Sequence, residues 1–438
     1  MTDDQPSFVI SVTRYGMPLV VGIFYLTASL GFEFTSDSAM HLASIVKYGF
    51  TSPLHDGYPS PLWHFLVSVG TVFHLDPLLT SKVLSLVFSC VTILASYLVA
   101  NEILRDRLIA FCISLALAMQ GWLLQLSPSG SALSLAIALT MAVLFFMLRN
   151  EYVVAPFCLG LCTLIYWQAV FLLIPLCVDV WINSVSKQRA LKVILSACLV
   201  YLSALLPWAM YAWINNVEGT PVLLRVSELP NTSFIAMSVL VVLGVLGVVG
   251  LVLLQMARQS RKESVRVHSG VLLFVIVMTL QALILHVETW YAALPLVVTY
   301  AFLGLAEMLK RFGREQLLYS ASFVLTGLLL VHLQFDYYGG NKSSMAAAIR
   351  QTNELRIAAE WIKVNTASGV DVCAENPGVL EYHAERPVAL LSQNEEARCE
   401  LVVTSRQEMQ GYEVVFRPMM TADAATIPAR HYAVWRKR

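Results

Sequence analysis

The chain has 438 residues, of which 57% are hydrophobic and only 13% charged, and its mean hydropathy is +0.67. Soluble globular proteins carry about 25% charged residues. The composition therefore excludes an ordinary soluble protein and indicates an α-helical polytopic membrane protein. Lys and Arg balance Asp and Glu, 29 against 29, so net charge gives no argument for a nucleic-acid partner.

The first apolar segment, 14–32, is predicted to remain as a membrane span, because no small-residue cleavage site follows it. A polar segment comes next and contains two shorter stretches with helical patterning, 37–49 and 60–75. The second stretch is short for a span and carries His64 and His74, which suits a helix in the membrane interface. We therefore expect both helices to lie on, or dip into, the outer face of the membrane.

Asp37 is the candidate catalytic residue of this polar segment. Transfer of a sugar to a hydroxyl needs a base that takes the acceptor proton. A carboxylate at the membrane surface meets this need when the donor is linked to a lipid. A structural alternative is that Asp37 caps the helix that follows, since Thr35, Ser36 and Asp37 are all good capping residues. The two roles are compatible.

Five nearby residues are candidate substrate contacts, and each has a simpler structural interpretation. Glu33 follows the first span and is either part of the site or a solvated residue at a helix end. His41 lies one helical turn after the candidate base and either binds substrate or faces the surface. Asp56 either orients sugar hydroxyls or makes an Asx turn. Tyr58 and Trp63 either stack on a sugar or belong to the interfacial aromatic belt.

Apolar runs of roughly 16 to 24 residues recur up to residue 333 and predict about eleven membrane-spanning helices. The predicted spans are 14–32, 78–100, 108–126, 131–149, 152–166, 169–184, 190–214, 233–256, 268–286, 289–309 and 315–333.

Every second loop between these spans is basic, and the positive-inside rule places the basic loops in the cytoplasm. Their basic residues are Arg105, Arg107, Arg149, Lys187, Arg189, Lys192, Arg258, Arg261, Lys262, Arg266, Lys310, Arg311 and Arg314. The N-terminus is then cytoplasmic, and residues 334–438 lie outside. This parity requires 152–184 to form a tight hairpin that turns near Trp167-Gln168. One long helix there would invert the later orientation.

Three residues on the outer side of later spans complete the candidate site. His286 and Glu288 mark an outer turn, and ionisable residues at that depth are functional candidates by default. Arg225 lies in the outer loop 215–232 and is a candidate partner for a lipid phosphate, with Lys47 as a competing cation. The simpler interpretation of Arg225 is an ordinary loop charge.

Residues 334–438 are richer in charge than the membrane domain, 1–333, and are expected to form a small extracytoplasmic α/β domain. The stretch 345–364 has the pattern of an amphipathic helix. Two short apolar runs, Val370–Ala374 and Leu401–Thr404, are expected strands.

Two of the eight cysteines, Cys373 and Cys399, lie in this polar region. They could form a disulfide if the region is outside the cytoplasm, although sequence alone does not show that they are close. The other six lie in apolar segments and are expected to be ordinary small hydrophobic residues. Asp37 and His41 are too few ligands to indicate a metal, so we predict no metal and no cofactor.

The order of these features resembles the C-type (GT-C) integral-membrane glycosyltransferases that use polyprenyl-phosphate sugars. Those proteins have a first span, an outer loop with an acidic motif, two surface helices, a bundle of spans and often an outer C-terminal domain. Their acidic pair is expected at Ser36-Asp37-Ser38. The G-Y-T-S-P-L-W signature of one bacterial branch, which includes arabinofuranosyl- and mannosyltransferase-like members, is similar to Gly57-Tyr58-Pro59-Ser60-Pro61-Leu62-Trp63. A stretch of their outer domains is similar to Gly378-Val379-Leu380-Glu381-Tyr382 and Arg386-Pro387-Val388.

The chain departs from the pattern of this superfamily at three places. Only one residue of the acidic pair is present, Asp37. A Gly-Leu-Glu-Thr stretch of the branch is replaced by Ser129-Gly130-Ser131-Ala132, which lacks the Glu. An Arg-Tyr pair is replaced by Tyr291-Ala292, so the resemblance supplies no cation for the donor phosphate. Matches at the level of single residues cover 33–63 and 372–390.

The resemblance implies an inverting glycosyltransferase of a bacterial inner or plasma membrane. It would move a hexose or pentose from a polyprenyl-phosphate donor to a glycan, lipid or protein acceptor on the outer face. One alternative is a transporter or flippase of lipid-linked sugars, which typically shows internal repeats. Another is an oligosaccharide ligase or polymerase, which typically has a large central outer loop. We find neither feature in the sequence.

Overall fold

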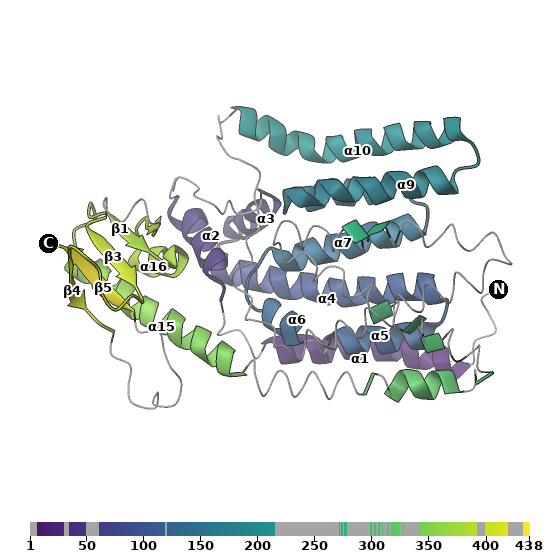
Figure 1. The fold of residues 1–438 in the computed structure, drawn as a ribbon, viewed down its shortest axis with the longest axis horizontal. Coiled ribbons are helices and arrows are strands. Elements are labelled where there is room, and N and C mark those ends of the chain that lie inside the picture. The colour runs from purple at the N-terminus through teal and green to yellow at the C-terminus, as the bar shows by residue number, and fades with distance from the viewer. Residues whose placement is uncertain are drawn as a thin grey trace.

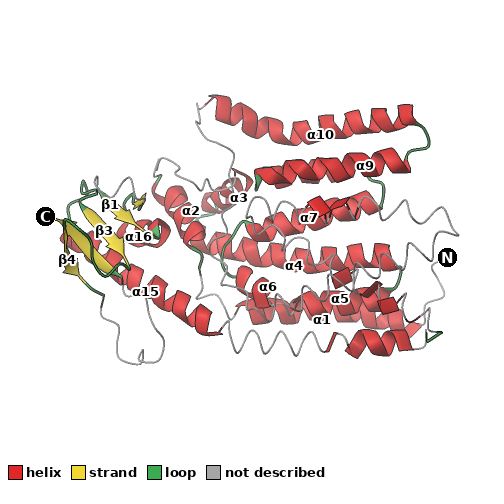
Figure 2. Cartoon of the chain, in the orientation of Figure 1, coloured by secondary structure: helices red, strands yellow, loops and turns green. Residues whose placement is uncertain are grey.

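The computed structural model contains a bundle of helices with a smaller α/β unit at one end (Figure 1, Figure 2). It describes residues 7–29, 35–49, 61–118, 121–214, 342–391, 399–418 and 432–438, with short stretches between 271 and 327. The residues outside the described part include the loop 215–232 and, wholly or in part, the predicted spans 233–256, 268–286, 289–309 and 315–333.

The helices of the bundle are α1 (Ser7–Ser29), α4 (Pro77–Leu104), α5 (Arg107–Ala118), α6 (Gly121–Leu126), α7 (Leu133–Leu148), α8 (Val154–Thr163), the 3-10 helix η1 (Trp167–Leu172), α9 (Leu173–Asn183) and α10 (Lys187–Ile214). Two described helices are long and apolar enough to cross a membrane, Pro77–Leu104 and Lys187–Met210. The predicted span 108–126 is divided between α5 and α6. The number of about eleven spans therefore stays a prediction.

Helix α4 packs closely against its neighbours because one of its faces consists of small residues. Ser81, Ser85, Ser89 and Ser96 recur at helical spacing along this face and are buried. Their hydroxyls are satisfied locally or by a neighbour: that of Ser89 donates to the carbonyl of Ser85 at 2.9 Å, and that of Ser85 to the carbonyl of Leu126 at 3.1 Å. Small side chains let helix backbones approach, and paired hydroxyls tolerate burial.

Residues 152–184 reverse direction, as the alternation of basic and non-basic loops requires. Tyr152, just before α8, donates its hydroxyl to Asp179 near the end of α9 at 3.0 Å. The start of the first helix and the end of the second therefore lie together, so the two helices are antiparallel. The 3-10 helix η1 makes the turn at Trp167-Gln168, and the predicted reversal is confirmed.

Two short helices, α2 (Asp37–Tyr48) and α3 (Pro61–Val72), lie at one end of the bundle, next to the α/β unit (Figure 1). Their bounds agree with the helices predicted over 37–49 and 60–75. Gly49 ends α2 with φ +68°, a left-handed conformation in which its N–H bonds to the carbonyl of Ile45.

The α/β unit is built from α15 (Lys342–Asn365), α16 (Pro377–Ala384) and the strands β1 (Val372–Ala374), β2 (Ala389–Leu390), β3 (Leu401–Thr404), β4 (Tyr412–Phe416) and β5 (Ala433–Lys437). The strand order is β2-β1-β3-β5-β4. Strand β1 pairs in parallel with β2 and β3, whereas β5 pairs antiparallel with β3 and β4. The predicted amphipathic helix and both predicted strands are confirmed, and β2, β4 and β5 were not anticipated.

The α/β unit shares a hydrophobic core with the helices beneath it. Leu355, Ile362 and Val379 of this unit form one buried cluster with Met40 of α2, and Leu78 of α4 packs against it. The unit is thus seated directly on α2 and on the start of α4.

A disulfide joins Cys373 in β1 to Cys399, which lies just before β3, with a sequence separation of 26. Closing a loop of this length removes conformational freedom from the unfolded chain and is expected to stabilise by about 3 kcal/mol. We expect the double variant Cys373→Ser, Cys399→Ser to unfold at a lower temperature than the wild type in detergent. Reductant should lower the wild-type midpoint to that of the variant, and an unchanged midpoint in the variant would contradict the expectation.

Candidate functional site

The first turn of α2 carries the candidate base. Ser36 is the capping residue of the helix, and its side chain accepts a hydrogen bond from the N–H of Ala39 at 3.2 Å. Asp37 is therefore the first residue inside the helix. The structural alternative, in which Asp37 is the cap, is wrong, because the adjacent serine already fills that role. A carboxylate in the first turn of a helix is favourably placed relative to the helix dipole.

A tight turn between α6 and α7 holds this end of α2 in place. The N–H and the hydroxyl of Ser36 both donate to the carbonyl of Ser129, at 3.1 and 3.2 Å. The next residue, Gly130, has φ +77°. A Cβ added there would lie 2.8 Å from Oγ of Ser81 and 2.9 Å from Cβ of Ala39. The turn thus wedges its backbone between α2 and α4, where only glycine fits.

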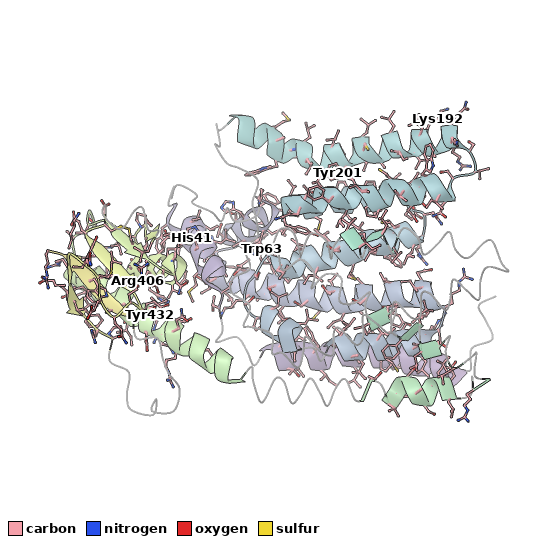
Figure 3. All side chains as sticks on the ribbon, viewed as in Figure 1. His41, Trp63, Lys192, Tyr201, Arg406 and Tyr432 are labelled. Carbon is pink, nitrogen blue, oxygen red and sulfur yellow. A yellow bond between two sulfur atoms is a disulfide. The ribbon has the colours of Figure 1, made fainter. Side chains whose placement is uncertain are left out.

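His41 is connected to the α/β unit through a buried carboxylate. Its Nδ1 lies 2.5 Å from Oε2 of Glu381, a residue of α16. The same oxygen accepts from the hydroxyl of Ser44 at 3.0 Å, and Oε1 accepts from the N–H of Val388 at 3.1 Å. Glu381 has no exposed surface, whereas the His41 side chain is 20% exposed. Both lie where α2 meets α16, and His41 is labelled in Figure 3.

Further contacts join α16 to the start of α4 and to the end of α2. The hydroxyl of Tyr382 donates to Asp76, the capping residue of α4, at 3.1 Å. Burial and the Asp76 carboxylate raise the pKa of the Tyr382 phenol, which keeps it protonated as a donor. The ammonium of Lys47 lies 5.1 Å from the centres of the Tyr48 and Tyr382 rings, within the range of a cation–π interaction.

Lys82 is a functional candidate that the sequence analysis did not single out. It lies in the second turn of α4 and is only 8% exposed. Its backbone nitrogen lies 3.6 Å from the position that a Cβ at Gly130 would take. Lys82 is therefore next to the turn that also contacts Ala39 of α2. A single lysine inside the predicted span 78–100 was the available signal, because ionisable residues within spans are functional candidates by default.

Trp63 lies in the packing of the bundle. Its side chain is 2% exposed and belongs to the main hydrophobic cluster, with the ring of Phe88 at a centroid distance of 6.2 Å. This position differs from the exposed ring that sugar stacking or an interfacial belt would need. The cause is the seating of α3 against α4, which covers the indole.

The structure leaves several predicted site residues unplaced. Those outside the described residues are Glu33, Asp56, Tyr58, Arg225, His286 and Glu288. Among the residues that the structure describes, no group of three or more His, Cys, Asp or Glu side chains could hold a metal ion.

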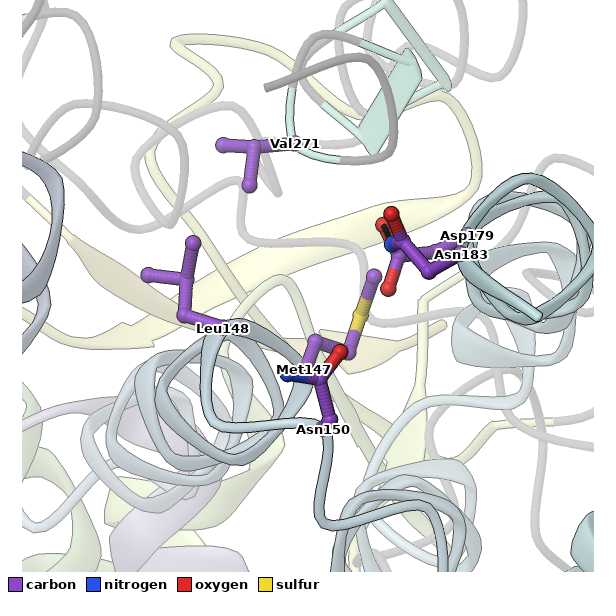
Figure 4. Close-up of a pocket in the computed structure, with 6 residues that line it drawn as sticks. All are labelled: Met147, Leu148, Asn150, Asp179, Asn183 and Val271. Carbon is purple, nitrogen blue, oxygen red and sulfur yellow. Dashed lines mark hydrogen bonds between the residues drawn. The ribbon is translucent and has the colours of Figure 1, made fainter. Parts of the chain in front are cut away.

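A small pocket at the other end of the bundle contains a second buried carboxylate, Asp179 (Figure 4). Its two oxygens accept from the hydroxyl of Tyr152 and from Nδ2 of Asn183, both at 3.0 Å. The Tyr152 hydroxyl is also 2.8 Å from Oδ1 of Asn150. These bonds tie the start of α8 to the end of α9, and we interpret the cluster as a structural brace.

No known protein family and no curated protein matches this chain. Among solved structures it is similar to the oligosaccharyltransferase AglB from Archaeoglobus fulgidus, in complex with an inhibitory peptide and a dolichol-phosphate. That match has a TM-score of 0.56 and 11% identity, and covers 90% of this chain and 69% of AglB.

The chain is also similar to ArnT from Cupriavidus metallidurans. The match to the apo state has a TM-score of 0.53 and 13% identity over 97% of this chain and 98% of ArnT. The match to ArnT bound to undecaprenyl phosphate has a TM-score of 0.53 and 12% identity, and covers 95% of this chain and 97% of ArnT. These likenesses agree with the GT-C architecture expected from the sequence, and the signature that begins at Gly57 is not tested by them. The chain therefore has the fold shared by AglB and ArnT.

Proposed function

We propose that this chain is a membrane glycosyltransferase that moves a sugar from a polyprenyl-phosphate donor to an acceptor on the outer face of the membrane. One observation carries the proposal: α2 brings Asp37 to the junction of the bundle, the Ser129-Gly130 turn and the α/β unit. The fold supports it, because two of the structures it matches hold a lipid phosphate, dolichol-phosphate in AglB and undecaprenyl phosphate in ArnT.

In the proposed reaction an acceptor hydroxyl attacks the anomeric carbon of the donor sugar. The bond from that carbon to the phosphate oxygen breaks, and the lipid phosphate leaves with the bonding electrons. The carboxylate of Asp37 takes the proton of the hydroxyl. A single displacement of this kind inverts the configuration at the anomeric carbon.

The two ends of the bundle differ in a way that supports the proposed orientation. Arg149 pairs with Glu102 at 2.9 Å, which brings the C-terminal ends of α7 and α4 together. Lys192 lies at this same end, away from His41 (Figure 3). The disulfide lies at the other end, and disulfides persist in oxidising compartments. With basic residues favoured in the cytoplasm, the N-terminus is cytoplasmic and residues 334–438, the proposed α/β domain, are extracytoplasmic.

The surface of α10 suits contact with lipid. Leu191, Leu195, Leu199, Leu202 and Leu206 recur at helical spacing, and their exposed fractions lie between 56% and 63%. The opposite face packs on α8. A leucine stripe of this length in water would be an aggregation hazard, whereas in a bilayer it faces acyl chains.

The donor phosphate needs a cation near Asp37, and we assign this role to Lys82. We prefer Lys82 to Lys47 because ten residues of helix place Lys47 about 15 Å along α2 from Asp37. Arg225 stays a second candidate. We expect Lys82→Met to raise KM for the lipid donor about 10- to 100-fold, as expected for the loss of one charge-assisted contact. Lys82→Arg should retain most of the affinity, and equal KM values in all three proteins would contradict the assignment.

The sugar itself is proposed to contact His41, Glu33, Asp56 and Tyr58, which come from α2 and the residues that flank it in sequence. The outer residues His286 and Glu288 are proposed to complete the site. The acceptor is a glycan, lipid or protein of the cell envelope.

The test of this function is transfer of radiolabelled sugar from polyprenyl-phosphate donors in membranes that carry the wild-type chain. Release of lipid phosphate together with a labelled acceptor is the expected result. Movement of the labelled lipid across the bilayer without transfer would establish a flippase instead. Since AglB is an oligosaccharyltransferase, transfer of a preassembled oligosaccharide is the second candidate, and the size of the transferred glycan distinguishes the two.

A further inference from the structure

A fully buried carboxylate, Glu381, joins three separate segments of the chain. Its oxygens accept hydrogen bonds from the imidazole of His41, the hydroxyl of Ser44 and the N–H of Val388. The first two belong to α2, and the third follows α16. The carboxylate therefore has three hydrogen-bond donors around it, two from α2 and one from the segment after α16, although the Ser44 hydroxyl is shared with the carbonyl of His41 at 2.8 Å.

Stability alone is a poor explanation for this arrangement. Burying a charged group requires desolvation, and buried ion pairs can often be replaced by apolar side chains without loss of stability. The surrounding contacts of α2 with the α/β unit are already hydrophobic, through Met40 and its neighbours. What a carboxylate adds, and an apolar side chain cannot, is directional control of the imidazole ring.

The geometry defines that control. Nδ1 of His41 lies against Oε2 of Glu381, so the carboxylate favours the tautomer that carries a proton on Nδ1. The lone pair of the neutral ring is then on Nε2. The His41 side chain is 20% exposed. Helical spacing puts His41 on the same face of α2 as Asp37, which precedes it by one turn.

We propose that Glu381 is a positioning residue for this site. It fixes the orientation of the His41 imidazole and keeps the proton on Nδ1, which sets how this ring contacts the bound sugar or acceptor in the site of the base Asp37. The α/β unit thereby contributes to a site whose base lies at the end of the bundle. This inference rests on the proposed glycosyl transfer.

The substitution Glu381→Gln tests the idea because an amide offers only one acceptor oxygen. If that oxygen keeps the N–H of Val388, the amide NH₂ faces Nδ1 of His41. Nδ1 must then accept, and the ring proton moves to Nε2. The variant keeps the shape of the side chain and inverts the tautomer.

We expect Glu381→Gln to reduce kcat about 10- to 100-fold, the size typical of a group that orients a site residue. The ¹⁵N chemical shifts of His41, assigned by comparison with His41→Gln, should report the tautomer change in the absence of any substrate. The double variant Glu381→Gln, His41→Gln should be no slower than His41→Gln alone, because Glu381 acts through the His41 imidazole. The control Glu385→Gln, on the exposed partner of Lys363 at the end of the same helix, should retain full activity.

Three results would overturn the proposal: unchanged ¹⁵N shifts in Glu381→Gln, additive effects of the two substitutions, or a loss of kcat in step with a lowered unfolding temperature. If Glu381→Gln proves too unstable to purify, the ¹⁵N shifts of wild-type His41 still decide which nitrogen carries the proton. A wild-type protein that transfers no sugar would refute the proposed function, whereas the shifts would still show whether Glu381 sets the tautomer.

Discussion

Asp37→Asn is expected to reduce sugar transfer by about 100- to 10,000-fold, the range that general base catalysis supplies. Asparagine has nearly the same size as aspartate but cannot take a proton from the acceptor hydroxyl. The helix should be unaffected, because Ser36 supplies the cap. The measurement is the rate of labelled product formation at saturating donor, with the unfolding temperature recorded in parallel.

Asp76→Asn is the matched control for this substitution. Asp76 is a carboxylate at the same end of the bundle, where it caps α4 by accepting from the N–H of Leu79 at 3.0 Å. Asparagine caps helices about as well as aspartate, and its NH₂ group can donate to the Tyr382 hydroxyl that contacts the other oxygen of Asp76, so this variant should remain active. Full activity in Asp37→Asn would remove the base from the mechanism, and equal losses in both variants would indicate a general effect of charge at the membrane face.

The elements that could be predicted from the sequence are those whose pattern is local. The helix α15 was predicted because Leu355, Ala358, Ala359 and Ile362 recur at helical spacing, and all four are buried on one side. The existence and bounds of the helices α2 and α3 were predicted from their length and flanking turns. The strands β4 and β5 were missed because their exposed positions and charged residues, Glu413 in β4 and Arg436 and Lys437 in β5, weaken the apolar pattern.

The connections of the site could not be predicted, because they join distant segments. His41 and Glu381 are 340 residues apart, and a glutamate in a helix of eight residues gives no sign in the sequence that it will be fully buried. The role of Gly130 depends on its neighbours in α2 and α4, which only the folded chain brings together. In contrast, Lys82 could have been found, because a lysine inside an apolar span is unusual by itself.

Gly130→Ala is expected to have the largest effect on stability among single substitutions at this site. A left-handed residue with a Cβ costs about 1 to 2 kcal/mol, and overpacking adds about 1 to 3 kcal/mol. The added Cβ would lie 2.9 Å from Cβ of Ala39, which is held by the helix backbone and cannot rotate away. Either the turn or α2 must therefore move, and the thermal unfolding midpoint should fall.

Gly411→Ala is the control that separates the cost of a left-handed backbone from the steric clash expected in Gly130→Ala. Gly411 has φ +81°, but a Cβ there would meet nothing within 4 Å. This variant should lose only the cost of the left-handed conformation and should retain its activity. Gly130→Ala should lose activity in addition, because a displaced α2 misplaces Asp37 and His41 together, and an error of about 1 Å in such a site can cost about 100-fold in rate. Equal destabilisation and full activity in both variants would show that the turn after α6 is not what holds α2 in position.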